Sequence, residues 1–515
     1  MENSQKSRTY NSILNSLVGI ASSLITVILN FIVRIVIVRE LGEEVNGIHN
    51  LFQNITNFIA LIEAGFSTAM VIHLYKPIKD ADQDSTKAIM YFYKKVYITI
   101  AIIYTLLCVI INCFAVPLLV ESSIPIWKVR IYFAIYTLIT PFSYLTYHKI
   151  SILYAEQKNR VKVIVATASE IVFRGLQIIT VIIFHQYYLF LILMIFEKVA
   201  CNLICSHYVN KRHPYLKSKE KVYVSDETKK SIYRTVRPVF INNIAANVQT
   251  SAKSILISAL LGNISIVGYF GNYQLVTSTA QLLFSQFGGA LTSSFGNLAV
   301  EGDKGHMYAV YRKVAFQLDW LAIILCSGFI CCIQSFILLF FGEHFILNMT
   351  VVIILTIEMY VTLLNIPIIS IQNAMGLHKK DQVMMIVQAV VAIILGYTGG
   401  KLFGMPGILL GLLIPQFFCT LLNKGIVINK TAFGKSAGEF ILFLTIEIIK
   451  GLVVATCCFF VCRFINTGNL ILDLFAKGGS VIVISLILFV ALSFHEKYFK
   501  ETIKLIKSFI RRRKN

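Results

Sequence analysis

The chain has 515 residues, of which 57% are hydrophobic and only 14% are charged. Soluble domains carry about a quarter charged residues, so this composition excludes a set of water-soluble domains and predicts an all-α polytopic membrane protein. The net charge of +21 would indicate nucleic-acid binding in a soluble protein. Cytoplasmic loops of membrane proteins collect Lys and Arg, however, so we expect no nucleic-acid partner.

Apolar runs long enough to cross a bilayer recur along the whole chain. The first, Ile13 to Val38, is too long for a cleaved signal peptide and is expected to be retained. The predicted spans number fourteen, six before a basic loop and eight after it. They lie at about 13–38, 47–73, 94–119, 128–154, 163–184, 188–209, 238–262, 265–295, 315–341, 350–375, 383–399, 407–428, 439–463 and 477–494.

The basic residues are distributed unevenly between the two sides of these spans. The side that holds the N-terminus carries 36 of the 47 Lys and Arg residues, the other side carries 6, and 5 lie within spans. Cytoplasmic loops are the basic ones, so both termini are predicted to be cytoplasmic. Most of the positive charge therefore orients the chain in the membrane.

Two short matches at nearly one offset indicate an internal repeat. Leu41-Gly42 corresponds to Leu261-Gly262, and the segment 150–155 corresponds to 369–374. We therefore predict two parallel six-helix lobes plus two extra C-terminal helices. The predicted boundaries are an N-lobe at 1–210, a basic cytoplasmic loop at 211–237, a C-lobe at 238–430, two further spans within 431–494 and a cytoplasmic tail at 495–515.

The tail has an apolar stripe at helical spacing. Its members are Phe499, Ile503, Ile506 and Ile510, with Lys and Arg residues around them. This pattern predicts a basic amphipathic helix that lies on anionic membrane lipids. Binding of a partner protein is the alternative.

Charged residues within spans are costly and commonly face protein or a water-filled cavity. Arg34 and Lys253 lie at nearly matching depth in the first helix of each predicted lobe. Two such cations beside a central cleft would suit an anionic substrate, since Arg can grip phosphate oxygens bidentately. The alternatives are that Arg34 reaches the outer interface and that Lys253 forms a structural ion pair.

Other residues within spans have two interpretations each. Arg174 is a third candidate substrate cation, or it is neutralised by Glu170 four residues earlier. Glu63 binds a coupling proton or cation, or it pairs with a lobe cation. Pro141 and Pro367 are candidate hinges or static bends.

Two further pairs of charged residues lie within spans. Glu197 and Lys198 are adjacent on span 6 and point in different directions, so each is expected to need its own partner. Glu447 and Lys450, three residues apart in span 13, present a weaker case for a functional role.

No pattern in the sequence indicates catalysis. Walker A, Gly-x-Ser-x-Gly and His-Glu-x-x-His sequences are lacking, and the cysteines lie in apolar runs without metal-ligand spacing. We therefore predict a protein that is not an enzyme, with no catalytic residue, metal site or cofactor.

Several motifs resemble bacterial Wzx-type polysaccharide transporters of the multidrug/oligosaccharidyl-lipid/polysaccharide (MOP) exporter superfamily. They are Asn11, Asn15, Asn30-Phe31 and Arg34, then the turn from Arg39 to Gly47, Glu63-Ala64-Gly65-Phe66-Ser67, and Leu74-Tyr75-Lys76-Pro77-Ile78 before an acidic loop. The motifs lie mainly within residues 11–80.

The resemblance implies a flippase for undecaprenyl-pyrophosphate-linked oligosaccharide in the bacterial cytoplasmic membrane. It also implies a cationic cavity between lobes, which Arg34 and Lys253 match by position and Arg174 by type, and a polysaccharide polymerase as a candidate partner. The alternatives are a drug/cation antiporter of the same fold, a lipid II-type flippase and a membrane glycan polymerase. Lipid II flippases carry arginine in span 2, so Glu63 at this place makes a lipid II-type flippase less favoured. The short outer loops make a glycan polymerase less favoured.

Overall fold

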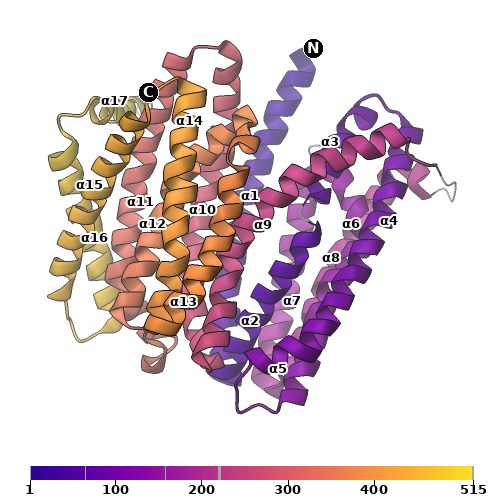
Figure 1. Cartoon of the computed structure of the whole chain (residues 1–515), viewed down its shortest axis with the longest axis horizontal. Coiled ribbons are helices and arrows are strands. Elements are labelled where there is room, and N and C mark those ends of the chain that lie inside the picture. Colours follow the sequence, from indigo (N-terminus) through magenta and orange to yellow (C-terminus); the bar gives the residue numbers. More distant parts are fainter. Residues whose placement is uncertain (1, 64, 157, 218–221, 513–515) are drawn as a thin grey trace. The chain divides into compact units, whose positions relative to one another are not determined.

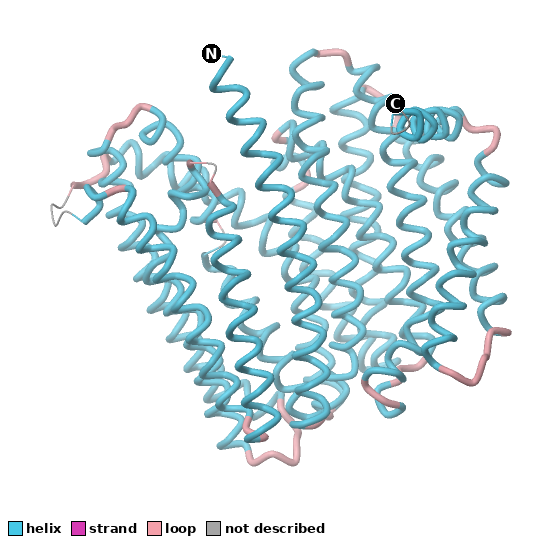
Figure 2. The backbone as a smooth tube through the Cα atoms, turned by 180° about the vertical axis from the view of Figure 1, so that it is seen from behind, coloured by secondary structure: helices cyan, strands magenta, loops and turns pink. Residues whose placement is uncertain are grey.

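A computed structural model describes residues 2–63, 65–156, 158–217 and 222–512. Throughout this part of the chain the regular structure is helical, and short loops join the helices (Figure 2). The predicted all-α fold is therefore confirmed. Ala64, Lys219, Lys221 and the side chains of Asn11, Asn15, Ile506 and Ile510 lie outside what is described.

The chain divides into two compact units, and the first contains residues 1–271. Within it α6 packs against α4 and α8, and α1 packs along α7 (Figure 1). Its helices are α1 (Glu2–Leu41), α2 (Glu43–Ile59), η1 (Ala60–Glu63), α3 (Phe66–Lys79), α4 (Gln83–Ile110), η2 (Ile111–Ala115), α5 (Val116–Leu119), α6 (Ile126–Ala155), α7 (Asn159–Phe184), α8 (Tyr187–Arg212), η3 (Pro214–Lys217), α9 (Asp226–Leu261) and the first turns of α10 (Ile264–Glu301).

The second unit contains residues 272–515. In it α11 packs against α12, α15 and α16. Its helices are the rest of α10, α11 (Lys304–Phe340), η4 (Glu343–Phe345), α12 (Met349–Met375), η5 (Leu377–Lys380), α13 (Gln382–Pro415), η6 (Gln416–Asn423), α14 (Lys424–Phe433), α15 (Ala437–Arg463), α16 (Leu470–Ser493) and α17 (Lys497–Arg512).

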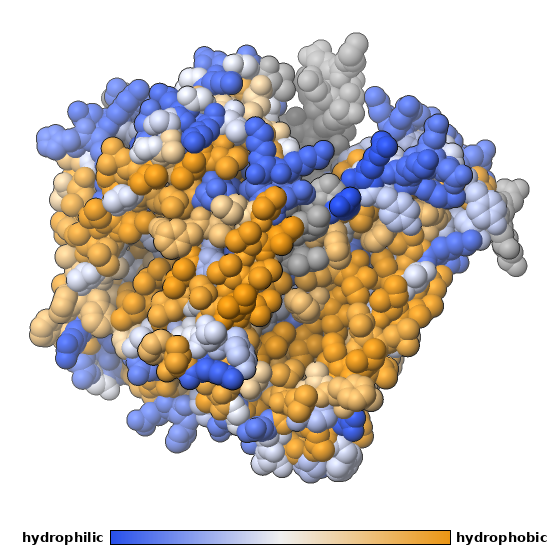
Figure 3. Space-filling model, in the orientation of Figure 1, coloured by the Kyte–Doolittle hydropathy of each residue, from blue (hydrophilic) through white to orange (hydrophobic). Residues whose placement is uncertain are grey.

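Nine helices of the described chain are long and apolar enough to cross a membrane. Apolar side chains cover the flanks of α11–α16, and hydrophilic residues gather at the helix ends (Figure 3). An exposed apolar flank of this extent needs lipid around it, so the chain is a multi-pass membrane protein. The count of fourteen spans and the side of the termini stay predictions.

Predicted spans 11 and 12 both lie in the segment from α13 to α14. At Gly404 the backbone leaves the helical region, with φ 61° and ψ −141°. After this break the chain returns antiparallel to itself, because Gly399 and Gly407 lie so close to each other's backbone that a Cβ on either would clash. The glycines therefore allow a tight hairpin between two helices.

The repeat predicted from Gly42 and Gly262 has support in the backbone. Both glycines have positive φ, 88° and 60°, at the junction between consecutive helices. A Cβ on Gly47 of α2 would overlap the carbonyl oxygen of Ile264, and one on Gly268 of α10 would lie 3.0 Å from the backbone of α2. The start of α2 and the start of α10 thus contact each other closely, and the two-lobe repeat stays a prediction.

The first half of α17 packs against protein. Phe499 is buried, with its ring 5.1 Å from that of Phe489 on α16, and Ile503 packs at the edge of the same core. Lys313 of α11 pairs with Glu501 at 3.6 Å. The described residues of the predicted stripe therefore pack against neighbouring helices. Contact between the basic face of α17 and membrane lipids stays a prediction.

Candidate functional site

Arg34 lies on the face of α1 that packs against α2. Its side chain is only 9% exposed, and its guanidinium donates one hydrogen bond to Asn46 Oδ1 and one, of 2.5 Å, to Asn50 Oδ1. These bonds hold the cation against α2 inside the first unit.

The two asparagines belong to an amide ladder, which we define as Asn46, Asn50 and Asn54 at four-residue intervals on α2. Asn46 Nδ2 donates to the Gly268 carbonyl at 3.2 Å, and Asn50 Nδ2 donates to the Val267 carbonyl at 3.3 Å. Each of these amides therefore accepts from Arg34 on one side and donates to α10 on the other. Residues four apart lie on one helix face, so the spacing alone could have indicated the ladder.

The ladder also reaches α9, where Lys253 lies. Asn54 Nδ2 donates to Ser254 Oγ at 3.0 Å, and Lys253, the preceding residue, is only 5% exposed. Arg34 and Lys253 are thus both buried, on helices that pack against α2. Both predicted cations are therefore buried within the first unit, and the cationic cavity between the lobes stays a prediction.

Arg174 of α7 pairs with the neighbouring helix α8. Its Nε lies 3.7 Å from Glu197 Oε2, and its Nη1 donates to Gln177 at 3.3 Å. Glu170 instead accepts a 2.5 Å hydrogen bond from Thr26 of α1. Arg174 and Glu170, which could have paired with each other, therefore contact two different helices: Arg174 contacts α8 and Glu170 contacts α1.

Glu197 is shared by two cations. Lys198 lies 3.7 Å from Glu197 Oε1, although adjacent residues on a helix usually point apart, and the expectation that each needs its own partner was wrong. The long lysine side chain, half exposed, reaches back to the buried carboxylate of its neighbour. Arg174 is thus part of an ion pair with a buried carboxylate, and its role as a substrate cation stays a prediction.

Glu63 lies where the helix of predicted span 2 is interrupted. It ends η1, and its half-buried carboxylate faces the hydroxyl groups of Tyr97 on α4 and Tyr144 on α6. Tyr97 and Tyr144 are themselves buried. The carboxylate is therefore next to hydroxyl donors, which leaves its pairing with a lobe cation as a prediction.

The two candidate hinge prolines lie inside continuous helices. Pro141 is in the middle of α6 and Pro367 in the second half of α12. Proline removes one helix hydrogen bond, so each position is weaker than its neighbours. Both bending roles stay predictions.

The second unit holds a polar cluster that sequence reasoning mostly missed. Asp319 of α11 and Glu447 and Lys450 of α15 are all buried, and Tyr360 of α12 and Glu496 complete the group. Asp319 lies within a predicted span and could have been found by the search that found Glu63. Its proximity to the two charged residues of α15, more than 120 positions later, required the structure.

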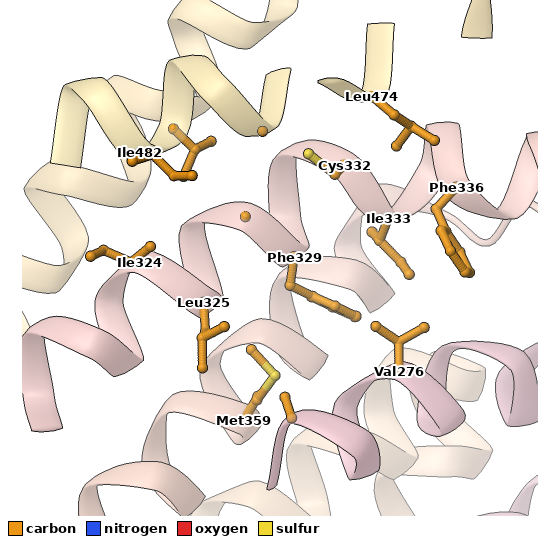
Figure 4. Close-up of a pocket in the computed structure, with 14 residues that line it drawn as sticks. Val276, Ile324, Leu325, Phe329, Cys332, Ile333, Phe336, Met359, Leu474 and Ile482 are labelled. Atoms are coloured by element: carbon orange, nitrogen blue, oxygen red, sulfur yellow. The ribbon is translucent and has the colours of Figure 1, made fainter. Parts of the chain in front are cut away.

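An apolar pocket of about 370 Å³ lies between α10, α11, α12 and α16 (Figure 4). Leu325, Phe329 and Phe336 of α11 face Val276, Met359 and Ile482 across it. Its lining is almost free of polar atoms, which suits a hydrocarbon chain. Within the described residues, no group of three His, Cys, Asp or Glu side chains could hold a metal ion.

Helices with apolar flanks and buried charges at their contacts define a multi-pass membrane protein. A family model described as polysaccharide biosynthesis protein matches residues 12–295. The match covers more than half of the chain, which therefore belongs to this polysaccharide biosynthesis family. Its sequence matches no curated protein.

Solved structures share the fold at low identity. The lipid II flippase MurJ in an inward closed conformation superposes with a TM-score of 0.69 at 16% identity, covering 93% of this chain and 99% of that one. An inward-facing multidrug resistance MATE family transporter of the MOP superfamily gives 0.60 at 14%, covering 79% and 96%. A mutant of the Vibrio cholerae MATE transporter VcmN gives 0.56 at 13%, covering 84% and 99%. The chain has the fold of these MOP superfamily transporters.

Proposed function

We propose that the protein flips undecaprenyl-pyrophosphate-linked oligosaccharide repeat units across the bacterial cytoplasmic membrane by alternating access. Membership of the polysaccharide biosynthesis family and the shared transporter fold support this assignment. A pyrophosphate and its sugars must cross about 30 Å of hydrocarbon. Buried cations and amides lower that barrier, while the polyprenyl tail can stay in lipid.

The observation that carries the proposal is Arg34 on its amide ladder. An arginine within a membrane helix costs about 2.5–3.5 kcal/mol on insertion scales, so its presence needs a compensating role. Asn46 and Asn50 fix the guanidinium plane through two of its five N–H donors. A fixed, planar donor group is suited to bidentate binding of a phosphate oxygen pair.

Lys253 contributes a second charge to the same unit. It lies on α9 beside Ser254, which the amide ladder contacts. A lysine ammonium supplies a point charge that can follow a moving phosphate. We assign the pyrophosphate first to Arg34 and Lys253, with Arg174 as a weaker third candidate because Glu197 already neutralises it. In this account both buried cations become accessible when the lobes rock apart.

The pocket of Figure 4 is a candidate groove for the polyprenyl tail. One wall is α16, which contains the last predicted span, outside the two predicted lobes. An apolar groove beside a lobe would let the tail accompany the headgroup without leaving a hydrophobic environment. A polymerase that uses the flipped repeat units stays a predicted partner.

Depletion of the protein in cells tests the assignment. Lipid-linked repeat units should stop reaching the outer leaflet, measured by the accessibility of their sugars to a membrane-impermeant label. Re-expression of the wild type or of Lys435→Ala should restore export, since Lys435 is a surface lysine paired with Glu439. Arg34→Ala and Lys253→Ala should fail to restore it at equal protein level. Unchanged export after depletion would refute the assignment.

A drug/cation antiporter is the second candidate, favoured by the similarity to MATE transporters. Cationic drugs would require accessible carboxylates in the cavity. Glu170 and Glu197 are already bonded to other side chains, and Glu63 is the remaining candidate. Drug resistance that depends on Glu63 and persists in Arg34→Ala would favour the antiporter. Export of lipid II, without export of other lipid-linked oligosaccharides, would favour a lipid II-type flippase.

A further inference from the structure

Four charged side chains and one tyrosine meet in the second unit, at the contact of α11, α12, α15 and the α16–α17 junction. Asp319, Glu447 and Lys450 are 2%, 3% and 6% exposed. Lys450 Nζ donates to Glu447 Oε1 at 3.0 Å and also to Glu496 Oε1, and Glu496 is partly open to the surface. We call these residues, with Tyr360, the carboxyl cluster.

Each of the two buried carboxyl groups has one oxygen with a donor and one without. The Tyr360 hydroxyl donates to Asp319 Oδ1 at 2.7 Å, and Lys450 Nζ donates to Glu447 Oε1 at 3.0 Å. Asp319 Oδ2 and Glu447 Oε2 are buried without a donor. The Tyr360 hydroxyl that bonds Asp319 also lies 3.1 Å from the Glu447 carbonyl oxygen, and both carboxyl groups line one small cavity. A buried acceptor without a donor is costly, and two adjacent carboxylates repel. One proton between them removes both penalties.

The surroundings decide which carboxyl holds the proton. Lys450 lies against Glu447 and stabilises its ionised form. Asp319 receives only the neutral hydroxyl of Tyr360. The cation nearest to Asp319 is Lys450, whose ammonium is bonded to Glu447 and Glu496. Cys326 on the same helix and Tyr311 on the cavity wall are neutral at neutral pH. The proton therefore belongs on Asp319, donated to Glu447.

A small cavity lies against both carboxyl groups of this pair. Its volume is about 20 Å³, and Asp319, Glu447 and Pro367 are among its lining residues. That volume is sufficient for about one water molecule, which needs roughly 10–15 Å³. Lys450 and the partly exposed Glu496 continue the polar chain toward the surface beside α17. The buried proton thus has a polar path by which it can leave and return.

We propose that Asp319 and Glu447 form a proton-binding site that regulates the packing of α15 and α16 against α11. The site lies in the second unit and is separate from the Arg34 network. With the proton bound, Asp319 donates to Glu447 and ties α11 to α15. After the proton leaves through the cavity water, two carboxylates face each other and the contact loosens. Because α15 and α16 contain the last two predicted spans, the proton controls the helices beside the apolar pocket.

Infrared titration of the full-length protein in lipid nanodiscs tests the site directly. The wild type should show a protonated carboxyl C=O band at neutral pH that disappears as the pH rises. Asp319→Asn should lack this band, because its amide donates the same hydrogen bond to Glu447 without a titrating proton. Glu447→Gln should also lack it, because the new amide donates to Asp319 in the reverse direction and favours the ionised aspartate. Glu439→Gln, which changes an exposed carboxyl of α15, should retain it.

Hydrogen exchange on the same samples tests the regulatory part. Relative to the intrinsic exchange rate at each pH, the protection of α15 and α16 should fall several-fold in the wild type as the band disappears. The same protection should be unchanged across this pH range in Asp319→Asn. A band that is absent from the wild type, or that survives both amide variants, would overturn the proposal. So would loss of the band on adding Na⁺ at constant pH, which would indicate a metal-cation site. Both readouts are independent of flipping, so the site can fail while the proposed transport function stands.

Discussion

Arg34 shows what can be learned about one residue from the sequence and what only the structure adds. Its position within an apolar run predicts a buried cation, and the structure confirms the burial. The amide ladder was also present in the sequence as three asparagines four residues apart. The carbonyls of Gly268 and Val267 that orient it lie more than 210 residues away, so local spacing could not have identified them.

Two substitutions of Arg34 should distinguish the contribution of its charge to flipping from the contribution of its planar shape. Arg34→Ala should reduce flipping at least tenfold at equal membrane protein level, because the pyrophosphate loses a bidentate donor. Arg34→Lys should restore only a fraction, since an ammonium cannot reach Asn46 and Asn50 as a planar fork does. The rate of outer-leaflet sugar exposure per unit of protein is the measurement. Full activity in Arg34→Ala would exclude a substrate role.

Glu63 should affect energy coupling if it binds an ion. Glu63→Gln should then change how flipping depends on an imposed proton or sodium gradient, measured in vesicles with each gradient collapsed separately. The exposed carboxyl variant Glu439→Gln is the matched control and should behave as the wild type. An unchanged gradient dependence in Glu63→Gln would leave Glu63 with a structural role beside Tyr97 and Tyr144.

The helices show which parts of the secondary structure the apolar runs predict well and which parts they miss. The predicted spans lie mostly in helix, although span 2 is interrupted after Glu63. The helices can also extend beyond the apolar runs, as α1 does from Glu2 to Leu41 where 13–38 was predicted. Polar residues at helix ends remain helical because the backbone bonds continue into the interface. Hydropathy therefore locates the membrane-embedded part of a helix better than its ends.

Close glycine contacts should matter most where α2 meets α10. Gly47→Ala would place a Cβ against the Ile264 carbonyl oxygen, well inside van der Waals contact, so the two helices must separate. Such overpacking typically costs about 1–3 kcal/mol, and the melting temperature in detergent should fall by several degrees. Gly175→Ala, in α7 with open space around it, should have an unchanged or higher melting temperature. Equal melting temperatures for the two variants would contradict the close contact.

For the whole molecule, composition alone was sufficient to predict a helical membrane protein, and the family match and fold agree with it. The carboxyl cluster could not be predicted, because Asp319 and Glu447 are 128 positions apart and no local pattern joins them. Charge asymmetry predicts the orientation of the chain, which the fold alone does not reveal. Orientation is therefore the whole-molecule property that most needs a direct test.

Cysteine labelling in intact cells tests the predicted orientation. Ser225→Cys, before α9, should be protected from a membrane-impermeant maleimide because its loop is predicted to be cytoplasmic. Asn466→Cys, between α15 and α16, should be labelled from outside. The parent protein, whose exposed cysteines Cys113 and Cys457 lie in apolar helices, provides the background. The reverse pattern would contradict the predicted topology.

The central claim is that this chain moves a pyrophosphate-linked oligosaccharide across a bilayer. The most direct measurement is the flipping rate of purified lipid-linked repeat units in vesicles that contain only the reconstituted protein, followed by headgroup accessibility from outside. We expect the wild type to expose the headgroups well above protein-free vesicles and Arg34→Ala to match protein-free vesicles. Equal headgroup exposure with and without the wild-type protein, under every imposed gradient, would contradict the account.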